Sequence, residues 1–286
     1  MLEQINQITG LGIRSCNSQS VGGGCINQAY RVSAGKAIFF VKLNRSDRAA
    51  MFESESTGLA ALAASHTLRT PKVICSGQAE EAAYLVLEYI ELLGHGDAEQ
   101  AGRQLASLHL TESSRFGNMP DNFIGSTPQT NLPNANWVHF WQQHRLGYQL
   151  QLAAKNGYGG QLQSRGERLM EQLPTLLTHH PIPSLLHGDL WSGNLGYTTT
   201  GEPVIFDPAA YYGDRETDIA MTELFGGFSS RFHAVYNEAW PLEPGYATRK
   251  TLYNLYHILN HLNLFGGGYE RQAIAMMDQL LAETRA

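Results

Sequence analysis

The spacing of hydrophobic residues differs between the two ends of this chain. Near the N-terminus, short apolar runs bounded by turn residues predict β-strands. These runs occupy residues 30–33, 37–43, 73–76 and 82–90. Helices are predicted over 2–9 and 47–65, because apolar residues recur there every three to four positions. The first part of the chain therefore mixes strands with a few helices.

The remainder is dominated by helical spacing. Apolar stripes predict helices over 137–152, about 160–177, 247–264 and 270–283, with another helix ending at His109. Residues 113–136 are rich in Gly, Pro, Asn, Ser and Thr, which predicts a loop. A short apolar strand is expected at 204–207 and a helix from Asp218 through Phe225. We interpret His179-His180 as part of a solvated loop and His109 as a packed helix-end histidine.

Composition excludes several classes of function. A net charge of −6 disfavours a sequence-independent grip on nucleic acid, which needs clustered Lys and Arg. The N-terminus lacks a signal peptide's basic and apolar regions, and no run of about eighteen apolar residues offers a membrane span. Three cysteines form no dense framework and suggest a reducing compartment. We therefore expect a soluble cytoplasmic protein that binds neither nucleic acid nor membrane.

One stretch carries a strong chemical signal. An apolar lead-in precedes His187-Gly188-Asp189, Asn194 follows Asp189 by five positions, and the run 204–207 ends in Asp207. Phosphoryl transfer from ATP needs a carboxylate that receives the proton of the attacking hydroxyl, and oxygen ligands that hold Mg²⁺. Asp189 suits the first role, and Asn194 and Asp207 suit the second because Mg²⁺ prefers oxygen donors.

A second group of residues is suited to binding phosphates. Gly22-Gly23-Gly24 lies between predicted strands, where glycine lets the backbone approach a phosphate closely, although an ordinary hairpin turn explains it too. Lys42 is one of five lysines in the chain and lies within a predicted apolar strand. Its ammonium would either face the phosphates or extend to solvent from the edge of the strand. Glu55 shares the apolar face of the 47–65 helix, so it is the predicted partner of Lys42, whereas Glu53 points away.

The complete set of motifs resembles the fructosamine kinase, or ketosamine-3-kinase, family, which is related to aminoglycoside and choline kinases. The resemblance covers nearly the whole length. It is carried by 22–30, 51–55, Asp121-Asn122-Phe123-Ile124-Gly125, 128–131, 187–194 and Tyr212-Gly213-Asp214-Arg215-Glu216-Thr217-Asp218. The His-Gly-Asp-x4-Asn pattern alone marks a small-molecule kinase, and the Trp191-Ser192-Gly193-Asn194 ending narrows it to this family.

The resemblance implies an α+β, two-lobed protein-kinase-like fold. Residues 1–89 would form an N-lobe with an antiparallel sheet and one helix, and residues 90–286 a mainly helical C-lobe. The implied reaction is ATP- and Mg²⁺-dependent phosphorylation of the 3-hydroxyl of a ketosamine, free or protein-bound. The product sheds its sugar, so the implied biological role is deglycation.

The resemblance also implies roles for individual residues. Asp189 would accept the proton, Asn194 and Asp207 would hold metal, and Lys42 with Glu55 would position the phosphates. The backbone of the lobe-joining segment Glu88-Tyr89-Ile90 would meet the edge of adenine. Trp191 would form a wall of the sugar site, and His187 and Asp218 would support the catalytic loop. Pro208 departs from the Asp-Phe-Gly of protein kinases and puts a Phe-driven switch in doubt.

Three alternatives stay open. An aminoglycoside- or choline-type kinase would share the fold and the catalytic residues. A protein kinase is disfavoured because only the ten residues 208–217 separate Asp207 from Asp218, too few for an activation loop. A pseudokinase would have lost at least one of Lys42, Asp189, Asn194 and Asp207, and all four are present.

A redox hypothesis concerns Cys25, which follows the three glycines. Nearby backbone N–H groups and Lys42 would favour a thiolate at this position. Oxidation, through an intermolecular disulfide or a sulfenic acid, would then switch activity off and create a redox-linked homodimer. The competing interpretation is a small residue that merely fits a tight turn.

Overall fold

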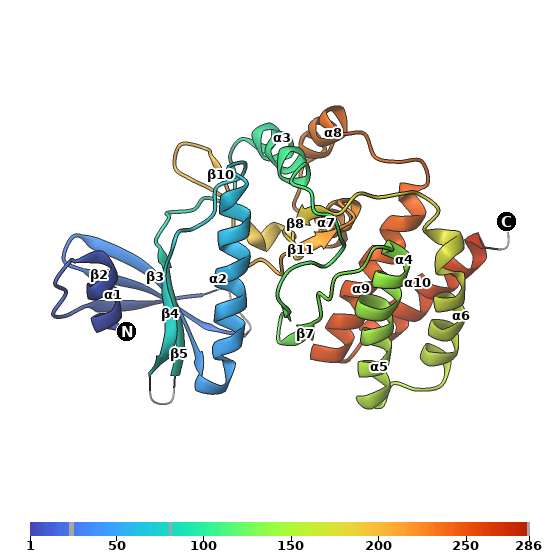
Figure 1. Cartoon of the computed structure of the whole chain (residues 1–286), viewed down its shortest axis with the longest axis horizontal. Helices are drawn as coiled ribbons and strands as arrows, with labels where there is room; N and C mark the ends of the chain where they lie inside the picture. The colour runs from blue at the N-terminus through green and yellow to red at the C-terminus, as the bar shows by residue number, and fades with distance from the viewer. Residues whose placement is uncertain (23–25, 80–81, 285–286) are drawn as a thin grey trace.

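The computed structural model describes residues 1–22, 26–79 and 82–284 and has two lobes (Figure 1). The first is built on a five-stranded antiparallel sheet. In spatial order its strands are β1 (Asn17–Val21), β2 (Gln28–Ala34), β3 (Ala37–Arg45), β5 (Ala82–Glu88) and β4 (Val73–Ala79). The predicted strands are therefore confirmed, with β5 ending at Glu88.

The two faces of this sheet are covered by different helices. Helix α1 (Leu2–Thr9) brings Ile5 onto the face that carries Val41, and α2 (Ala49–Ala64) brings Phe52 onto the face that carries Leu85. Side chains alternate between the faces of a strand, so Lys42, the neighbour of Val41, points to the α2 side. Because side chains alternate along β3, Lys42 faces α2, the helix that carries Glu55.

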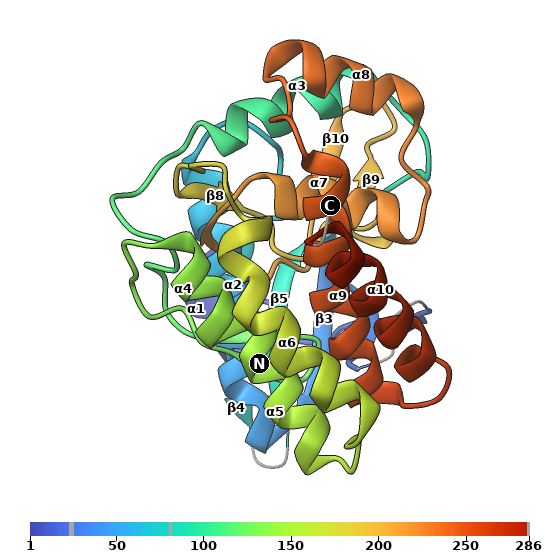
Figure 2. The same ribbon diagram turned by 90° about the vertical axis from the view of Figure 1, so that its right-hand side faces the viewer.

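The second lobe is mainly helical (Figure 2). Its helices are α3 (Ala98–His109), α4 (Trp137–Trp141), α5 (Gly147–Lys155), α6 (Gln161–Leu176), α7 (Glu216–Leu224), α8 (Ser230–Ala239), α9 (Tyr246–Phe265) and α10 (Tyr269–Glu283). A π-helical segment, Gln142–Leu146, joins α4 to α5. The largest core cluster lies here, where Trp137 donates from Nε1 to the Tyr253 hydroxyl at 3.0 Å.

Three short antiparallel hairpins or strand pairs complete this lobe. They are β6 (Asn122–Ile124) with β7 (Thr127–Gln129), β8 (Ser184–Leu186) with β11 (Tyr211–Gly213), and β9 (Leu195–Tyr197) with β10 (Pro203–Ile205). A 3₁₀ turn, Ser192–Asn194, lies between β8 and β9. These pieces bring the segments around residues 187–194 and 206–211 against each other.

The kinase-like fold expected from the sequence is confirmed, with local differences. Helix α8 was not predicted, since residues 226–246 carry several turn formers and no long apolar stripe. Helix α7 begins at Glu216, two residues before the expected start at Asp218. The loop predicted over 113–136 contains the small β6–β7 hairpin. Among the described residues, no helix combines the length and the apolar character needed to cross a membrane.

Two ion pairs join α7 to α9 and differ mainly in burial. Glu216 accepts from Arg249 through both carboxylate oxygens, at 2.6 and 2.8 Å, and both side chains are at most 3% exposed. Glu223 pairs with Lys250 at 2.7 Å, but these side chains are 31% and 35% exposed. Removing one partner of a buried ion pair leaves the other charge buried without a partner, which is strongly destabilising. An exposed ion pair contributes little to the free energy of unfolding.

We predict that Glu216→Gln lowers the free energy of unfolding by about 3–5 kcal/mol, because Arg249 keeps its charge without a carboxylate. The matched change Glu223→Gln should cost less than about 1 kcal/mol. Urea unfolding followed by circular dichroism measures both. Equal losses for the two variants would contradict the role of burial at this junction.

Candidate active site

The loop after β8 is fixed by one buried carboxylate. Asp218 accepts the backbone N–H of His187 at 2.7 Å and that of Gly188 at 2.9 Å. Gly188 has φ +82°, and a Cβ there would collide with the carbonyl oxygen of Ala209. Glycine is therefore required at this position. Asp218 lies in the first turn of α7, and its carboxylate bonds the loop.

His187 connects this loop to the strand that leads to Asp207. Its Nε2 lies 2.9 Å from the Phe206 carbonyl oxygen, and its Nδ1 accepts the Asp189 backbone N–H at 3.2 Å. Since one ring nitrogen accepts, the other must donate, which is the neutral tautomer with the proton on Nε2. Burial lowers the pKa of His187, in agreement with a neutral ring. The ring therefore ties the two segments together without adding charge.

Asp189 and Asn194 are held side by side by the tight turn between them. The Asn194 Nδ2 group donates to the Asp189 backbone carbonyl at 2.8 Å and to Asp189 Oδ2 at 3.2 Å. Burial raises the pKa of Asp189 to about 7, with the nearby Asp207 carboxylate acting in the same direction and Asn194 opposing it. A carboxylate with this pKa can accept a proton near neutral pH.

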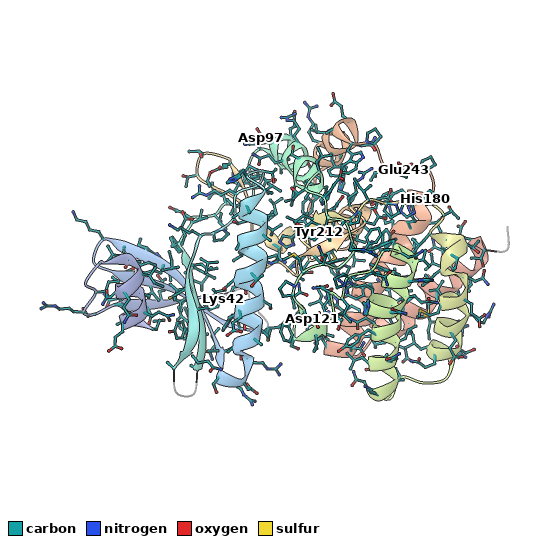
Figure 3. The ribbon with its side chains drawn as sticks, in the orientation of Figure 1. Lys42, Asp97, Asp121, His180, Tyr212 and Glu243 are labelled. Atoms are coloured by element: carbon teal, nitrogen blue, oxygen red, sulfur yellow. The ribbon has the colours of Figure 1, made fainter. Side chains whose placement is uncertain are left out.

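Lys42 is buried between two carboxylates. Its Nζ lies 2.7 Å from Glu55 Oε1 and also contacts Asp207 Oδ1. Figure 3 shows Lys42 between the sheet and α2. Burial by itself lowers the pKa of an ammonium, but the charges of Asp207 and Glu55 outweigh it and raise the pKa of Lys42 above its ordinary value. Glu53 is exposed, as expected for the outer side of α2.

Asp207 lies one residue after a backbone contact with Asn194. It follows β10 with φ +58°, an uncommon conformation for a residue other than glycine, and its side chain is 44% exposed. The neighbouring Phe206 N–H donates to the Asn194 carbonyl at 3.2 Å, so the two segments are in direct contact. Asn194 donates from its Nδ2 group to Asp189, and its side-chain oxygen accepts no hydrogen bond from any residue that the structure describes. These oxygen donors fit Mg²⁺.

The expected phosphate loop lies partly outside the described residues. Gly22 is exposed just after β1, whereas Gly23, Gly24 and Cys25 are not among the described residues. The far end of the loop is anchored on β3, since Asn44 Nδ2 donates to the Ile26 carbonyl at 3.2 Å and to Asn27 Oδ1 at 2.7 Å. The roles predicted for the three glycines and for Cys25 stay predictions.

The segment predicted to join the lobes uses its side chains for structure. Glu88 accepts from Arg69 at 3.0 Å, and Arg69 also donates to Glu202 at 3.0 Å in the turn between β9 and β10. The Arg31 guanidinium lies 5.2 Å from the centre of the Tyr89 ring. The Glu88 backbone N–H donates to the Lys72 carbonyl at 2.8 Å, and the contact of the Tyr89 and Ile90 backbone with adenine stays a prediction.

Trp191 lies beside the catalytic loop and is 38% exposed. Its indole ring lies over Gly193, where a Cβ would overlap the ring. The same ring meets Phe225 edge-on, with centroids 6.4 Å apart. The absence of a side chain at Gly193 therefore leaves room for the Trp191 ring.

Sequence reasoning missed a buried chain of hydrogen bonds behind Asp218. His109 Nε2 lies 3.2 Å from Asp218 Oδ2, and its Nδ1 lies 2.8 Å from the Tyr236 hydroxyl. Arg215 donates to the same hydroxyl at 3.0 Å. Burial would raise the pKa of Asp218, but hydrogen bonding and charge from His109 and His187 lower it. His109 is packed at a helix end, as expected, and in addition holds the carboxylate that fixes the loop.

The interpretation of His179 as solvated is wrong. Its side chain is 8% exposed, and its Nε2 lies 2.6 Å from Asp214 Oδ2, while Tyr253 donates to the same oxygen at 2.5 Å. The error arose because Asp214 is far away in sequence. His179, Asp214 and Glu216 have ligand atoms within 4.8 Å of one another, but Arg249 already occupies both Glu216 oxygens. The cluster is an ion-pair network. In Figure 3 the neighbouring His180 lies near Glu243 on the same side of the lobe.

The chain has extensive similarity to known proteins. A plant relative, the chloroplastic protein-ribulosamine 3-kinase of Arabidopsis thaliana, is 42% identical, with 98% of this chain and 85% of that protein covered. A protein named "Probable ketoamine kinase" from Synechocystis is 49% identical, with 98% of this chain and 95% of that protein covered.

Solved structures give the same result for the fold. A candidate fructosamine-3-kinase from Haemophilus somnus superposes with a TM-score of 0.90 at 28% identity, covering 98% of this chain and 96% of the other. Choline kinase from Streptococcus pneumoniae superposes with a TM-score of 0.66 at 16% identity, covering 98% and 97%, and shares the fold. The sequence profile of fructosamine kinase matches residues 1–283. This chain belongs to the fructosamine kinase family.

Proposed function

We propose that the protein transfers the γ-phosphoryl group of ATP to the 3-hydroxyl of a ketosamine. One observation carries the proposal: Asp189, with its raised pKa, lies beside Asn194 and Asp207, and Lys42 reaches Asp207 from the other lobe. Relatives named for ketoamine and ribulosamine substrates, at 49% and 42% identity, support this choice of acceptor. The sugar phosphate formed would then leave the amine, which is deglycation.

Asp189 takes the proton of the attacking hydroxyl in this mechanism. Asn194 donates to the Asp189 backbone carbonyl and to one carboxylate oxygen, which favours one orientation of the Asp189 side chain. The proton moves from the substrate oxygen to the Asp189 oxygen as the oxygen forms its bond to phosphorus, and ADP leaves. Burial raises the pKa of Asp189 to about 7, which makes this carboxylate a better proton acceptor than an exposed aspartate.

Lys42 orients the phosphates of ATP, and Glu55 holds Lys42 in place. Asn194 and Asp207 would hold Mg²⁺, which when bound neutralises charge on the phosphates. The glycines 22–24 would cover the phosphates, and the backbone at Tyr89 and Ile90 would meet adenine. We also propose that the boundary between the two lobes lies at residue 89 and that the protein is located in the cytoplasm.

An aminoglycoside- or choline-type acceptor is the second candidate, since kinases of both types share the fold. The discriminating experiment measures ADP formation with ribulose-, erythrulose- and fructose-lysine as acceptors, and with kanamycin and choline as controls. We expect turnover with at least one ketosamine and none with kanamycin or choline. Turnover with a control alone would replace the proposed acceptor.

We predict that Asp189→Asn lowers kcat by about 10²–10⁴-fold, because an amide cannot accept the proton. The amide oxygen can still bond Asn194, so the fold and ATP binding should be kept. Circular dichroism and nucleotide titration serve as controls. A variant that retains more than about half of the wild-type turnover would remove Asp189 from its assigned role.

We predict a matched difference between two glutamates on α2. Glu55→Ala should weaken ATP binding and lower turnover, because Lys42 loses its partner at 2.7 Å. Glu53→Ala should have little effect, since this side chain is exposed. Lys42→Ala should be at least as severe as Glu55→Ala. Nucleotide affinity and kcat measured for all three variants test the assignment, which equal effects of the two glutamates would overturn.

A further inference from the structure

The β6–β7 hairpin carries two buried amide side chains that bond the backbone just after Asp207. Asn122 begins β6 and Gln129 ends β7, and the two side chains are 7% and 2% exposed. The Asn122 Nδ2 group donates to the Ala210 carbonyl at 2.7 Å. The Gln129 Nε2 group donates to the Ala209 carbonyl at 3.2 Å. The hairpin therefore holds the chain two and three residues beyond Asp207.

The contacts of the two amide groups fix their orientation. A backbone carbonyl accepts and never donates, so each amide must turn its NH₂ group toward residues 209–210. The Gln129 NH₂ group also donates to Asn122 Oδ1 at 2.8 Å, and the Tyr256 hydroxyl of α9 donates to Gln129 Oε1 at 2.6 Å. Burial raises the pKa of Tyr256, so this hydroxyl keeps its proton. We call Asn122, Gln129 and Tyr256 the hairpin network.

The same backbone segment is constrained on its other sides. The Ala209 N–H donates to the His187 carbonyl at 2.9 Å, and the Ala209 carbonyl oxygen occupies the space that a Cβ on Gly188 would need. Helix α2 packs closely on Pro208, since a Cβ added to Gly58 would lie 3.2 Å from the proline ring. The catalytic loop, α2 and the hairpin network thus hold the segment together.

Asp207 depends on this support because of its backbone conformation. A residue other than glycine rarely has φ +58°, and it keeps such a conformation only where the surrounding structure fixes it. The next residue, Pro208, has no N–H to donate. Among the described residues, the backbone hydrogen bonds that fix the chain directly after Asp207 therefore begin at Ala209. These bonds act on the direction of the carboxylate that contacts Lys42.

We propose that Asn122, Gln129 and Tyr256 are positioning residues, which direct the Asp207 carboxylate toward the metal ion. This inference rests on the proposed function, in which Asp207 and Asn194 hold Mg²⁺. The hairpin network supplies no ligand of its own and acts through the backbone of residues 208–210. When one of its hydrogen bonds is lost, the Asp207 carboxylate is still present but takes up more orientations, so the affinity for the metal falls.

The test compares two buried tyrosines of α9 with different partners. Tyr256→Phe removes the hydroxyl that bonds Gln129. Tyr253→Phe removes a hydroxyl that bonds Asp214 and lies outside the hairpin network. Both variants keep the aromatic ring, so both should fold with a lower Tm. Titration with the ATP analogue AMP-PNP, with and without Mg²⁺, measures the gain in nucleotide affinity that the metal supplies.

Tyr256→Phe should reduce the gain from Mg²⁺ by about three- to tenfold, whereas Tyr253→Phe should leave it within about twofold of wild type. Gln129→Glu keeps the shape of the side chain but cannot donate to the Ala209 carbonyl, so its loss should be at least as large. Asp207→Ala gives the loss expected when the carboxylate is absent. Affinity for AMP-PNP without Mg²⁺ should stay close to that of the wild type in Tyr256→Phe.

Other outcomes overturn the inference in distinguishable ways. Equal changes in the two tyrosine variants, or no change in Tyr256→Phe, would show that the hairpin network supports only the fold. A loss of affinity that is the same with and without Mg²⁺ would assign the network to nucleotide binding instead of metal binding. If Mg²⁺ brings no gain in the wild type, the proposed metal site fails and the inference fails with it. None of these measurements needs an acceptor, so they do not depend on which hydroxyl is phosphorylated.

Discussion

The geometry of the candidate site depends on the two hydrogen bonds that Asp218 accepts from the backbone of the catalytic loop. A loop rich in glycine has many conformations, and a buried carboxylate that accepts two adjacent N–H groups selects one. The carboxylate is itself held by His109, which reaches Tyr236 and then Arg215. Helices α3, α7 and α8 thus act together on the position of Asp189.

The second constraint is that two carboxylates, those of Glu55 and Asp207, lie close to the Lys42 ammonium. Asp207 contacts Lys42, and its carboxylate helps to raise the pKa of Asp189. Without Lys42, Glu55 and Asp207 would be two acidic groups with no cation between them. The strand alternation that turns Lys42 toward α2 therefore matters for the proton-accepting group in the other lobe. A cation held by Asn194 and Asp207 would act in the same sense as Lys42.

Trp191, in the loop that carries Asp189, and Phe225 present exposed rings that contact each other edge-on. In the proposed mechanism Asp189, Asn194 and Lys42 serve phosphoryl transfer and do not distinguish one hydroxyl acceptor from another. Discrimination must come from groups that contact the rest of the acceptor. The exposed rings beside the loop are suited to that task, because they contact apolar groups and cations without demanding one fixed geometry.

Local sequence by itself determined much of this protein. Short apolar runs predicted β2 to β5, and helical spacing predicted α1, α2, α9 and α10, because these signals lie within each segment. The spacing of Asp189, Asn194 and Asp207 identified the chemistry, since these residues lie in two short segments. Helical periodicity also separated Glu55 from Glu53, because the two lie nearly on opposite sides of one helix.

Only the tertiary structure decided the contacts between residues that are distant in sequence. His109 meets Asp218 across 109 positions, and His179 meets Asp214 across 35. No local sequence pattern around either histidine indicates its partner. His109 was therefore interpreted only as packed, and His179 was wrongly interpreted as solvated. The contact between Trp191 and Phe225 has the same origin, since one ring comes from the loop after β8 and the other from the end of α7. Local periodicity reports which face of an element is buried, whereas the pairing of polar groups depends on how complete elements pack.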